Sequence, residues 1–297
     1  MKTDEKVKVI LDTDIGTDID DALALAYLLK QERCELLGVT TVTGQATLRA
    51  ELASAICRNV GRDDVPIHAG CEQALLIEMR QKAAQQAEAL GDWPRRRDFA
   101  PNTAVEFLRR TIRSHPGEIT LLTIGPLTNV AILFATDPEI PSLLSSVVLM
   151  CGRFFASMGG EWNAICDPHA TAVVFGAGSQ SRPPRLVSFG LDVTLRCQML
   201  PDECRRRFAA KALAPVRDFA EVWFRERDRV TFHDPLAAAC IFEPDLCRYA
   251  EGGVSVSLAP PTMGWTVFDP RTAANPHTVA QEVDPRRFFD HYFGVVK

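Results

Sequence analysis

Five aspartates fall within ten residues near the amino terminus, where a strand is expected to meet a helix: Asp12, Asp14, Asp18, Asp20 and Asp21. Carboxylates held this close repel one another unless a positive charge lies between them. The amino terminus of a helix offsets only about half a unit of charge. The cluster therefore favours a bound divalent cation. Ligands that are all oxygen favour a hard ion, Ca²⁺ or Mg²⁺, over zinc.

The elements on either side of this cluster would hold it in place. Val7–Leu11 is a short aliphatic run that predicts a buried strand. The residues that follow the aspartates, 22–28, begin an apolar helix. Thr17 with Asp20 three positions later resembles a capping box, which predicts a helix start near Asp18.

Other acidic motifs fit this stretch less well. One or two aspartates at such a junction would be ordinary caps, but five exceed what a cap needs. An EF-hand loop follows a helix and has Glu at its twelfth position, whereas a strand is expected here and Leu23 stands at that place. The phosphatase motif of the dehalogenase type, Asp-x-Asp-x-Thr, nearly fits, but Gly16 occupies the Thr position. Such a phosphatase remains an alternative, although the lysine and second acidic pair that it requires are not evident.

Composition excludes several classes of protein. The 297 residues are 46% hydrophobic and 24% charged, with a net charge of −5 and no basic stripe. This argues against a nucleic-acid binder or an anionic-membrane binder. The charged amino terminus lacks an apolar signal core, and no apolar run reaches the ~20 residues that span a bilayer. Nine scattered cysteines without a CxxC motif indicate buried thiols in a reducing cytoplasm.

Strands and helices alternate along the chain, which predicts an α/β fold with an open, mainly parallel (Rossmann-like) sheet and helices on both faces. No linker divides residues 1–297, so we expect a single domain. The further strands expected are Cys34–Thr43, Pro66–Ala69, Ile119–Ile124, Ser146–Met150, Arg185–Phe189, Val254–Leu258 and Trp265–Phe268. The further helices expected are Ala46–Val60, Leu75–Leu90, Thr103–Ser114, Val130–Ala135, Asp167–Phe175, Pro201–Arg229, Leu236–Phe242 and Phe288–Phe293.

Ligands of such a sheet collect outside the carboxyl ends of its strands. The polar residues that follow strands can therefore be pooled into one site, made of Asp12–Asp21, Gly44-Gln45, Gly125–Asn129, Glu161–Asn163 and His233-Asp234. This pool is rich in carboxylates and amides and poor in Lys and Arg. It suits a neutral, polyhydroxylated ligand held through a cation.

With these motifs in order, the chain resembles the nucleoside hydrolase family, calcium-dependent enzymes that cleave ribonucleosides to ribose and free base. The family signature Asp-x-Asp-x-Gly-x-Asp-Asp-Ala is matched by Asp12–Gly16 followed by Asp20–Ala22, with two extra residues between them. Further matches are GPLTNVA at Gly125, MGGEWN at Met158 and HDPLA at His233. The resemblance spans nearly the whole chain.

The resemblance implies a role for each residue of the pooled site. Asp14 matches a calcium ligand that is also the general base, and His233 matches an acid for the leaving base. The implied calcium ligands are Asp14, Asp21, Asp234 and the backbone carbonyl of Ile124. The implied substrate ligands are Asp20, Gln45, Glu161 and Asn163, with Asp12 orienting the loop. The family also implies a nucleoside as the small-molecule partner and a homodimer or homotetramer.

Two departures from the family pattern bear on the substrate. Gln45 stands where the family usually has Asn or Asp, and Arg153–Ser157 lacks the Asn that holds the 5′-hydroxyl. Phe154 or Phe155 would then present an apolar wall near C5′ of the sugar. A protein that kept the calcium-dependent sugar site but lost catalysis is a further alternative, against which the intact Asp14 weighs.

Overall fold

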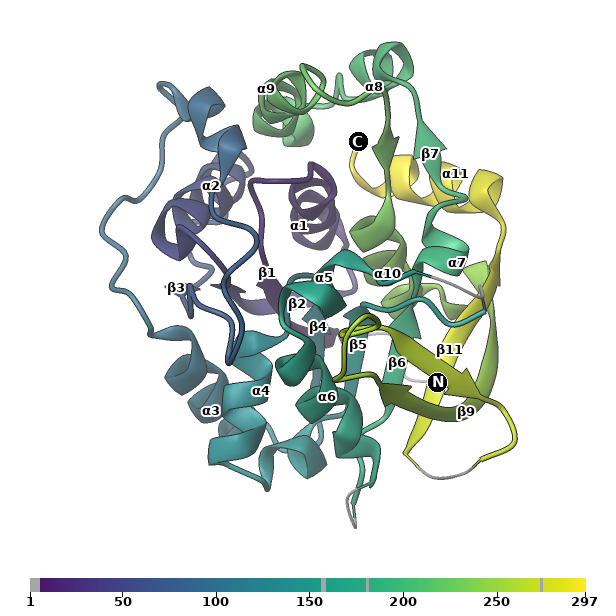
Figure 1. The fold of residues 1–297 in the computed structure, drawn as a ribbon. Helices are drawn as coiled ribbons and strands as arrows, with labels where there is room; N and C mark the ends of the chain where they lie inside the picture. The colour runs from purple at the N-terminus through teal and green to yellow at the C-terminus, as the bar shows by residue number, and fades with distance from the viewer. Residues whose placement is uncertain (1–5, 156–158, 180–181, 273–274) are drawn as a thin grey trace.

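The computed structural model describes residues 6–155, 159–179, 182–272 and 275–297. Its main sheet has nine strands in the order β10-β9-β11-β6-β5-β4-β1-β2-β3 (Figure 1). The strands are β1 (Val7–Thr13), β2 (Cys34–Thr41), β3 (Ile67–Ala69), β4 (Ile119–Thr123), β5 (Ser146–Met150), β6 (Leu186–Phe189), β9 (Cys247–Val256), β10 (Thr266–Asp269) and β11 (Pro276–Val283). All neighbours from β3 to β11 run parallel, and only β9 pairs antiparallel, with β11 and with β10. The predicted open, mainly parallel sheet is confirmed.

Helices cover both faces of this sheet, as predicted. The α-helices are α1 (Asp20–Lys30), α2 (Ala46–Asn59), α3 (Ala104–Ser114), α4 (Thr128–Thr136), α5 (Trp162–Cys166), α6 (Pro168–Gly176), α7 (Leu191–Thr194), α8 (Pro201–Arg207), α9 (Ala214–Trp223), α10 (His233–Phe242) and α11 (Pro285–Val295). One apolar core includes side chains of α1, α2, α10 and α11, and a second core includes those of α3, α4 and α6. Figure 1 shows the first group of helices on one side of the sheet and the second group on the other. In the part of the chain that the structure describes, no helix is long and apolar enough to cross a bilayer.

The strand order places a crevice beside β1. Six parallel strands follow the order β3-β2-β1-β4-β5-β6, so the chain moves outward from β1 in one direction and later returns to its other side at β4. In open α/β sheets ligands bind at this switch point, outside the carboxyl ends of the strands. Asp12 pairs in register with Thr123, which puts the residues after β1 and after β4 at the mouth of this crevice.

Three local predictions were wrong, and one strand of the main sheet was not predicted. Helix α1 begins at Asp20 without a side-chain cap, because the Thr17 hydroxyl donates to the carbonyl of Ala83 instead of capping the helix. In the segment expected as a helix over Leu75–Leu90, only a 3₁₀ turn at Gln85–Leu90 forms. The long helical region over Pro201–Arg229 is divided into α8 and α9, with a proline in the first turn of α9. Strand β11 was not predicted.

Candidate active site

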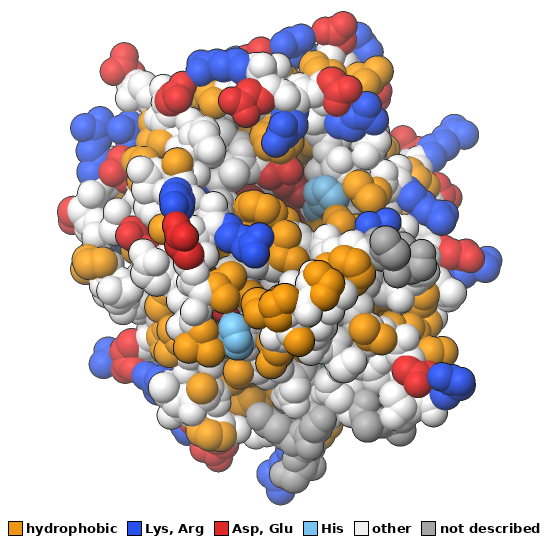
Figure 2. Space-filling view, in the orientation of Figure 1, with side chains coloured by type: hydrophobic (Ala, Val, Ile, Leu, Met, Phe, Trp, Pro, Cys, Tyr) orange, Lys and Arg blue, Asp and Glu red, His pale blue; other side chains and the backbone are white. Residues whose placement is uncertain are grey.

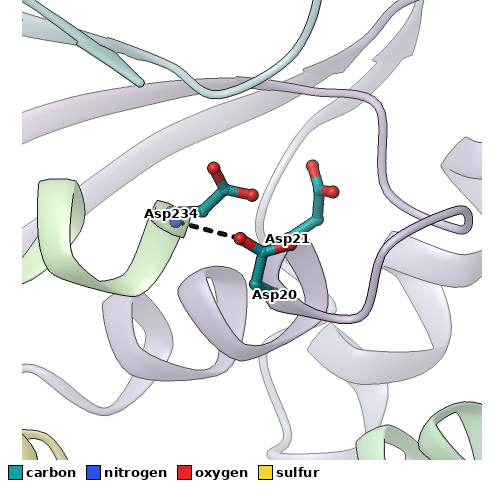
Figure 3. A group of neighbouring side chains, drawn as sticks. All are labelled: Asp20, Asp21 and Asp234. Carbon is teal, nitrogen blue, oxygen red and sulfur yellow. Dashed lines mark hydrogen bonds between the residues drawn. The ribbon is translucent and has the colours of Figure 1, made fainter. Parts of the chain in front are cut away.

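Three buried aspartates from distant parts of the chain meet beside the crevice. Asp20 and Asp21 form the first turn of α1, and Asp234 lies in the first turn of α10. One carboxylate oxygen from each residue lies within 4.8 Å of the others, and each residue is at most 3% exposed. Figure 3 shows Asp21 and Asp234 directing their carboxylates to the same side, from two helices that begin next to each other. The backbone N–H of Asp234 donates to Asp20 Oδ2 at 3.1 Å and joins the two helix starts.

The three carboxylates lie close together with little opposing positive charge, since the guanidinium of Arg49 lowers the pKa of Asp21 only as a minor effect. Burial, followed by repulsion from neighbouring aspartates, raises the pKa of Asp20, Asp21 and Asp234 well above the ordinary value. Buried carboxylates without a cationic partner are costly. A divalent cation would relieve this cost, and a set of oxygen ligands fits a hard ion. The residues present therefore fit a metal site that includes the predicted ligands Asp21 and Asp234. Its third member is Asp20, which was expected to bind the substrate, and not Asp14.

Asp14 lies directly after β1 and close to this cluster. The amide of Gln81 donates a hydrogen bond to its Oδ2. Its Oδ1 lies against Gly125, where an added Cβ would come within 2.7 Å of that oxygen, so glycine is required at the end of β4 for this approach. Burial raises the pKa of Asp14, while the neighbouring guanidinium of Arg49 opposes the shift. The charge of Asp14 also raises the pKa of Asp21.

Arg49, on α2, was not predicted to be part of the site. Its side chain is completely buried and donates to backbone carbonyls of the acidic loop and of two neighbouring segments. The acceptors are the carbonyls of Asp14, Ile15 (3.0 Å), Gly44 (2.8 Å) and Ala83 (3.2 Å). Arg49 therefore fixes the course of the loop with donors that are no longer free to bind a ligand. Helix α2 also carries Glu51 and Arg58, so no pattern in the sequence sets Arg49 apart.

Asp12 is buried inside the sheet below the acidic loop. Its Oδ1 accepts hydrogen bonds from the Thr40 hydroxyl and from Asn129 Nδ2 at 2.8 Å. Its Oδ2 has no hydrogen-bond partner among the described residues, and burial raises its pKa to about 7. Asn129 also donates to the carbonyl of Thr41 at 3.0 Å, which ties β1, β2 and the start of α4 together. These bonds hold Asp12 beneath the acidic loop, and its expected role in orienting that loop stays a prediction.

Asn163 and Glu161 lie at the start of α5. Asn163 Nδ2 donates to the Ile124 carbonyl at 2.9 Å and to the Met150 carbonyl at 3.1 Å. The carboxylate of Glu161 caps α5 and accepts the backbone N–H groups of Gly152 (3.1 Å), Asn163 (2.8 Å) and Ala164 (3.0 Å). Ile124 and Asn163, predicted as metal and substrate ligands, are therefore in direct contact. The side chain of Glu161 organises the backbone beside them.

Two further candidates have partners that affect their predicted roles. Gln45 is exposed, and its Oε1 accepts a hydrogen bond from the backbone N–H of Ala84 at 2.8 Å. This bond turns that oxygen toward residues 81–84. His233, the first residue of α10, has Nδ1 2.7 Å from the Thr194 hydroxyl, and burial lowers its pKa to about 4. Figure 2 shows a histidine beside acidic side chains in a hollow below α8 and α9.

The two phenylalanines expected near the sugar differ in their surroundings. Phe154 is buried and its ring packs near Phe175, at 6.5 Å between centroids. Phe155 is 40% exposed and meets Phe268 edge to face at 5.4 Å. Only Phe155 is open to solvent, so an apolar wall facing a ligand would depend on Phe155. The last two residues of the Arg153–Ser157 stretch lie outside the described residues.

Comparison with known proteins shows the family of this chain. The family model of the inosine-uridine preferring nucleoside hydrolases matches residues 9–290. The chain is 33% identical to the pyrimidine-specific ribonucleoside hydrolase RihA of Shewanella woodyi over 88% of each chain. It is 29% identical to uridine nucleosidase 1 of Arabidopsis thaliana, over 88% of this chain and 82% of that one. A purine-preferring ribonucleoside hydrolase from Gardnerella vaginalis superposes with a TM-score of 0.83, 25% identity and coverage of 97% of this chain and 98% of that chain. The chain thus belongs to the inosine-uridine preferring nucleoside hydrolase family, enzymes that hydrolyse the N-glycosidic bond of ribonucleosides.

Proposed function

We propose that this ribonucleoside hydrolase uses Ca²⁺ as its metal and Asp14 as its general base. The observation that carries the proposal is the buried cluster of Asp20, Asp21 and Asp234, which has oxygen ligands and little opposing positive charge. The carboxylates of Asp14, Asp21 and Asp234 and the Ile124 carbonyl would hold the ion. When bound, Ca²⁺ neutralises the clustered charge and lowers the pKa of water at the site.

Asp14 would take the proton from the attacking water. As the oxygen of that water bonds to C1′ of the ribose, the N-glycosidic bond breaks and its electron pair leaves with the base. Positive charge develops on the sugar ring in the transition state, so a pocket of buried carboxylates stabilises it. Asp20, Asn163, Glu161 and Gln45 are the proposed contacts to the sugar.

His233 would donate a hydrogen bond to the departing base. Since its pKa is about 4, the ring is neutral near pH 7. A neutral imidazole carries one N–H, and Nε2 can donate only if Nδ1 accepts from the Thr194 hydroxyl at 2.7 Å. The proposed tautomer therefore requires the Thr194 hydroxyl to direct its single proton to Nδ1 at 2.7 Å instead of to the Gly190 carbonyl at 3.2 Å. His233 then acts as a neutral donor and not as an imidazolium acid.

The test is a panel of purine and pyrimidine ribonucleosides assayed for free ribose, with Ca²⁺ and after its removal by a chelator. Asp14→Asn should lower kcat about 10²–10⁴-fold, as expected when a positioned base is lost, while circular dichroism and Ca²⁺-stabilised melting show that it folds. A wild type that releases no ribose from any nucleoside would favour a sugar-binding protein. An Asp14→Asn variant with normal turnover would overturn the assignment of the base.

The compartment and the assembly are also proposals. Nine cysteines that form no disulfide support a reducing compartment, the cytoplasm. The family resemblance supports a homodimer or homotetramer. Light scattering coupled to size-exclusion chromatography would test the assembly, and a mass near 32.8 kDa, that of one chain, would contradict it.

A further inference from the structure

Gln81 lies on a segment with no regular secondary structure, yet its side chain reaches the catalytic centre. Among residues 76–82 it alone is buried, with 4% exposure. Its Nε2 donates to Asp14 Oδ2 and to the Thr17 hydroxyl at 3.1 Å, and its Oε1 accepts from the indole N–H of Trp162. One amide therefore joins the acidic loop to the start of α5.

The amide can adopt only one orientation in this network. A carboxylate only accepts hydrogen bonds and an indole nitrogen only donates. Oε1 must therefore face Trp162, and Nε2 must face Asp14. Reversing the amide would place oxygen against carboxylate and nitrogen against indole N–H, so Trp162 fixes which end of Gln81 meets Asp14.

The surrounding backbone is built to bring Gln81 inward. An added Cβ at Gly44 would lie within 2.7 Å of the carbonyls of Gln81 and Lys82, so glycine is needed for this close approach. Thr17 and Arg49 both bond the Ala83 carbonyl, at 3.1 and 3.2 Å. Gln45, expected as a sugar ligand, accepts a hydrogen bond from the backbone N–H of Ala84, the next residue in the chain. These contacts hold the backbone of residues 81–84, at and directly after Gln81.

We propose that Gln81 is a positioning residue for Asp14, with Trp162 as the residue that orients Gln81. The two oxygens of Asp14 are distinguished by their neighbours, since Oδ2 meets the Gln81 amide and Oδ1 lies against Gly125. A carboxylate held at one oxygen cannot rotate freely about its Cβ–Cγ bond. The free oxygen keeps one direction toward the reacting water, as efficient proton transfer requires. The inference depends on the proposed role of Asp14 as general base.

The matched variants are Gln81→Met, which keeps the length of the side chain but removes both polar atoms, and Lys82→Gln, an exposed change on the same segment. We expect Gln81→Met to lower kcat about 10- to 100-fold with KM within threefold of wild type. Lys82→Gln should retain wild-type kcat and KM. A Gln81→Met enzyme with kcat within twofold of wild type would overturn the proposal, because filling the space would then suffice. A loss confined to KM would overturn it equally.

Trp162→Phe tests the same network without disturbing a buried group, since Trp162 is 48% exposed. It should lower kcat several-fold in the wild-type background and cause no further loss in Gln81→Met. Additive losses would show two independent roles and would contradict the proposal.

Tryptophan emission gives a readout without substrate. Gln81→Met should shift the emission in the wild-type background and leave it unchanged in the Trp162→Phe background. An unshifted spectrum means that the contact does not form in solution. Asp14→Asn is measured in parallel, so full activity there identifies a failure of the proposed base and not of Gln81.

Discussion

Asp20 Oδ2 accepts the backbone N–H of Asp234 at 3.1 Å, although the two residues are 214 positions apart in sequence. This bond holds the first turns of α1 and α10 together and places three carboxylates within reach of one ion. In the metal-free protein the same contact holds like charges together. The site therefore stabilises the fold only when a cation is bound, and its aspartates oppose folding when the cation is absent.

Asp234→Asn should separate these two effects. Removing one charge from the cluster should raise the melting temperature of the metal-free protein and reduce the further increase that Ca²⁺ produces. The measurement is thermal unfolding with a chelator and with a Ca²⁺ series, together with calorimetric Ca²⁺ affinity. Asp202→Asn, a surface carboxylate on α8, is the control and should change neither value. If Asp234→Asn kept the wild-type affinity for Ca²⁺, Asp234 would not be a ligand.

Thr194→Val should weaken the contribution of His233 without removing the ring. Valine keeps the shape of threonine but cannot donate to Nδ1, so the tautomer with Nε2–H loses its partner. We expect kcat to fall about tenfold for ribonucleosides, and His233→Ala to lose about 10²–10⁴-fold. A riboside with a 4-nitrophenolate leaving group needs no proton, so both variants should cleave it at nearly the wild-type rate. Equal losses on both classes of substrate would contradict a role in leaving-group departure.

The location of some candidate residues could be predicted from their position after a strand or at a helix start. The location of others depends on contacts between distant segments. The aspartates, Asn163 and His233 follow strands or begin helices, so their place at one edge of the sheet follows from the topology. Gln81 lies in a segment where Leu75–Leu90 has helical propensity, but bonds from Thr17, Arg49 and Gln45 to residues 83 and 84 override that propensity. Contacts between residues more than thirty positions apart leave no local pattern.

Contacts between distant residues also explain why the predicted cap does not form and why strand β11 was not predicted. Thr17 has the spacing of a capping box, yet its hydroxyl is used by Ala83, which no local rule can anticipate. Strand β11 begins with Pro276 and has the polar pair Gln281-Glu282 before its last residue, so its alternation is weak. It forms because β6 and β9 pair with it on either side. Tertiary pairing decides such strands.

Nucleosides should be better substrates than their 5′-monophosphates by about 100-fold or more in kcat/KM. The site is lined with carboxylates, and the donors of Arg49 are taken by backbone carbonyls. One contact between like charges at ~4 Å costs about 4 kcal/mol at the effective dielectric of a protein surface. Steady-state kinetics on a nucleoside and its monophosphate at fixed ionic strength provide the measurement. Comparable efficiencies would instead indicate that exposed Arg80, beside Gln81, receives the phosphate.

Glu161 should contribute to stability as well as to activity. Its carboxylate accepts three backbone N–H groups at the start of α5, and loss of an N-cap typically costs about 0.5–2 kcal/mol. Glu161→Ala should therefore unfold at lower urea concentration than wild type, whereas Glu161→Gln should retain most of the cap through its amide oxygen.

A 5′-deoxynucleoside tests whether Glu161 also binds the 5′-hydroxyl of the substrate. If wild type loses a hundredfold or more on that analogue, Glu161 or a neighbour still binds the 5′-hydroxyl, and an apolar wall at Phe155 does not explain this part of the site.

The last prediction concerns pH and a histidine remote from the catalytic residues. His277, on β11, is buried, stacks on Phe175 at 4.9 Å between centroids and has Nε2 3.1 Å from the Phe175 carbonyl. Since a carbonyl only accepts, Nε2 carries a proton. Its Nδ1 has no hydrogen-bond partner among the described residues, and burial lowers the pKa to about 4 from 6.5.

The sign of the pH effect follows from these two values. Below pH 6.5 the unfolded chain binds a proton at His277, and the native protein does not until about pH 4. The contribution of His277 to the free energy of unfolding is complete above pH 6.5 and is lost as the pH falls toward 4. The loss is about 2 kcal/mol between pH 7 and pH 5.

His277→Phe keeps the stacking on Phe175 and removes the titrating group. It should be less stable than wild type at pH 7, because the Phe175 carbonyl loses its donor, yet lose less stability on acidification. The measurement is urea unfolding of both proteins at a series of pH values with the metal chelated throughout. Because all other titrating groups are common to the two proteins, the difference between their curves isolates His277, and parallel curves would show that its ring is accessible to protons in the native state.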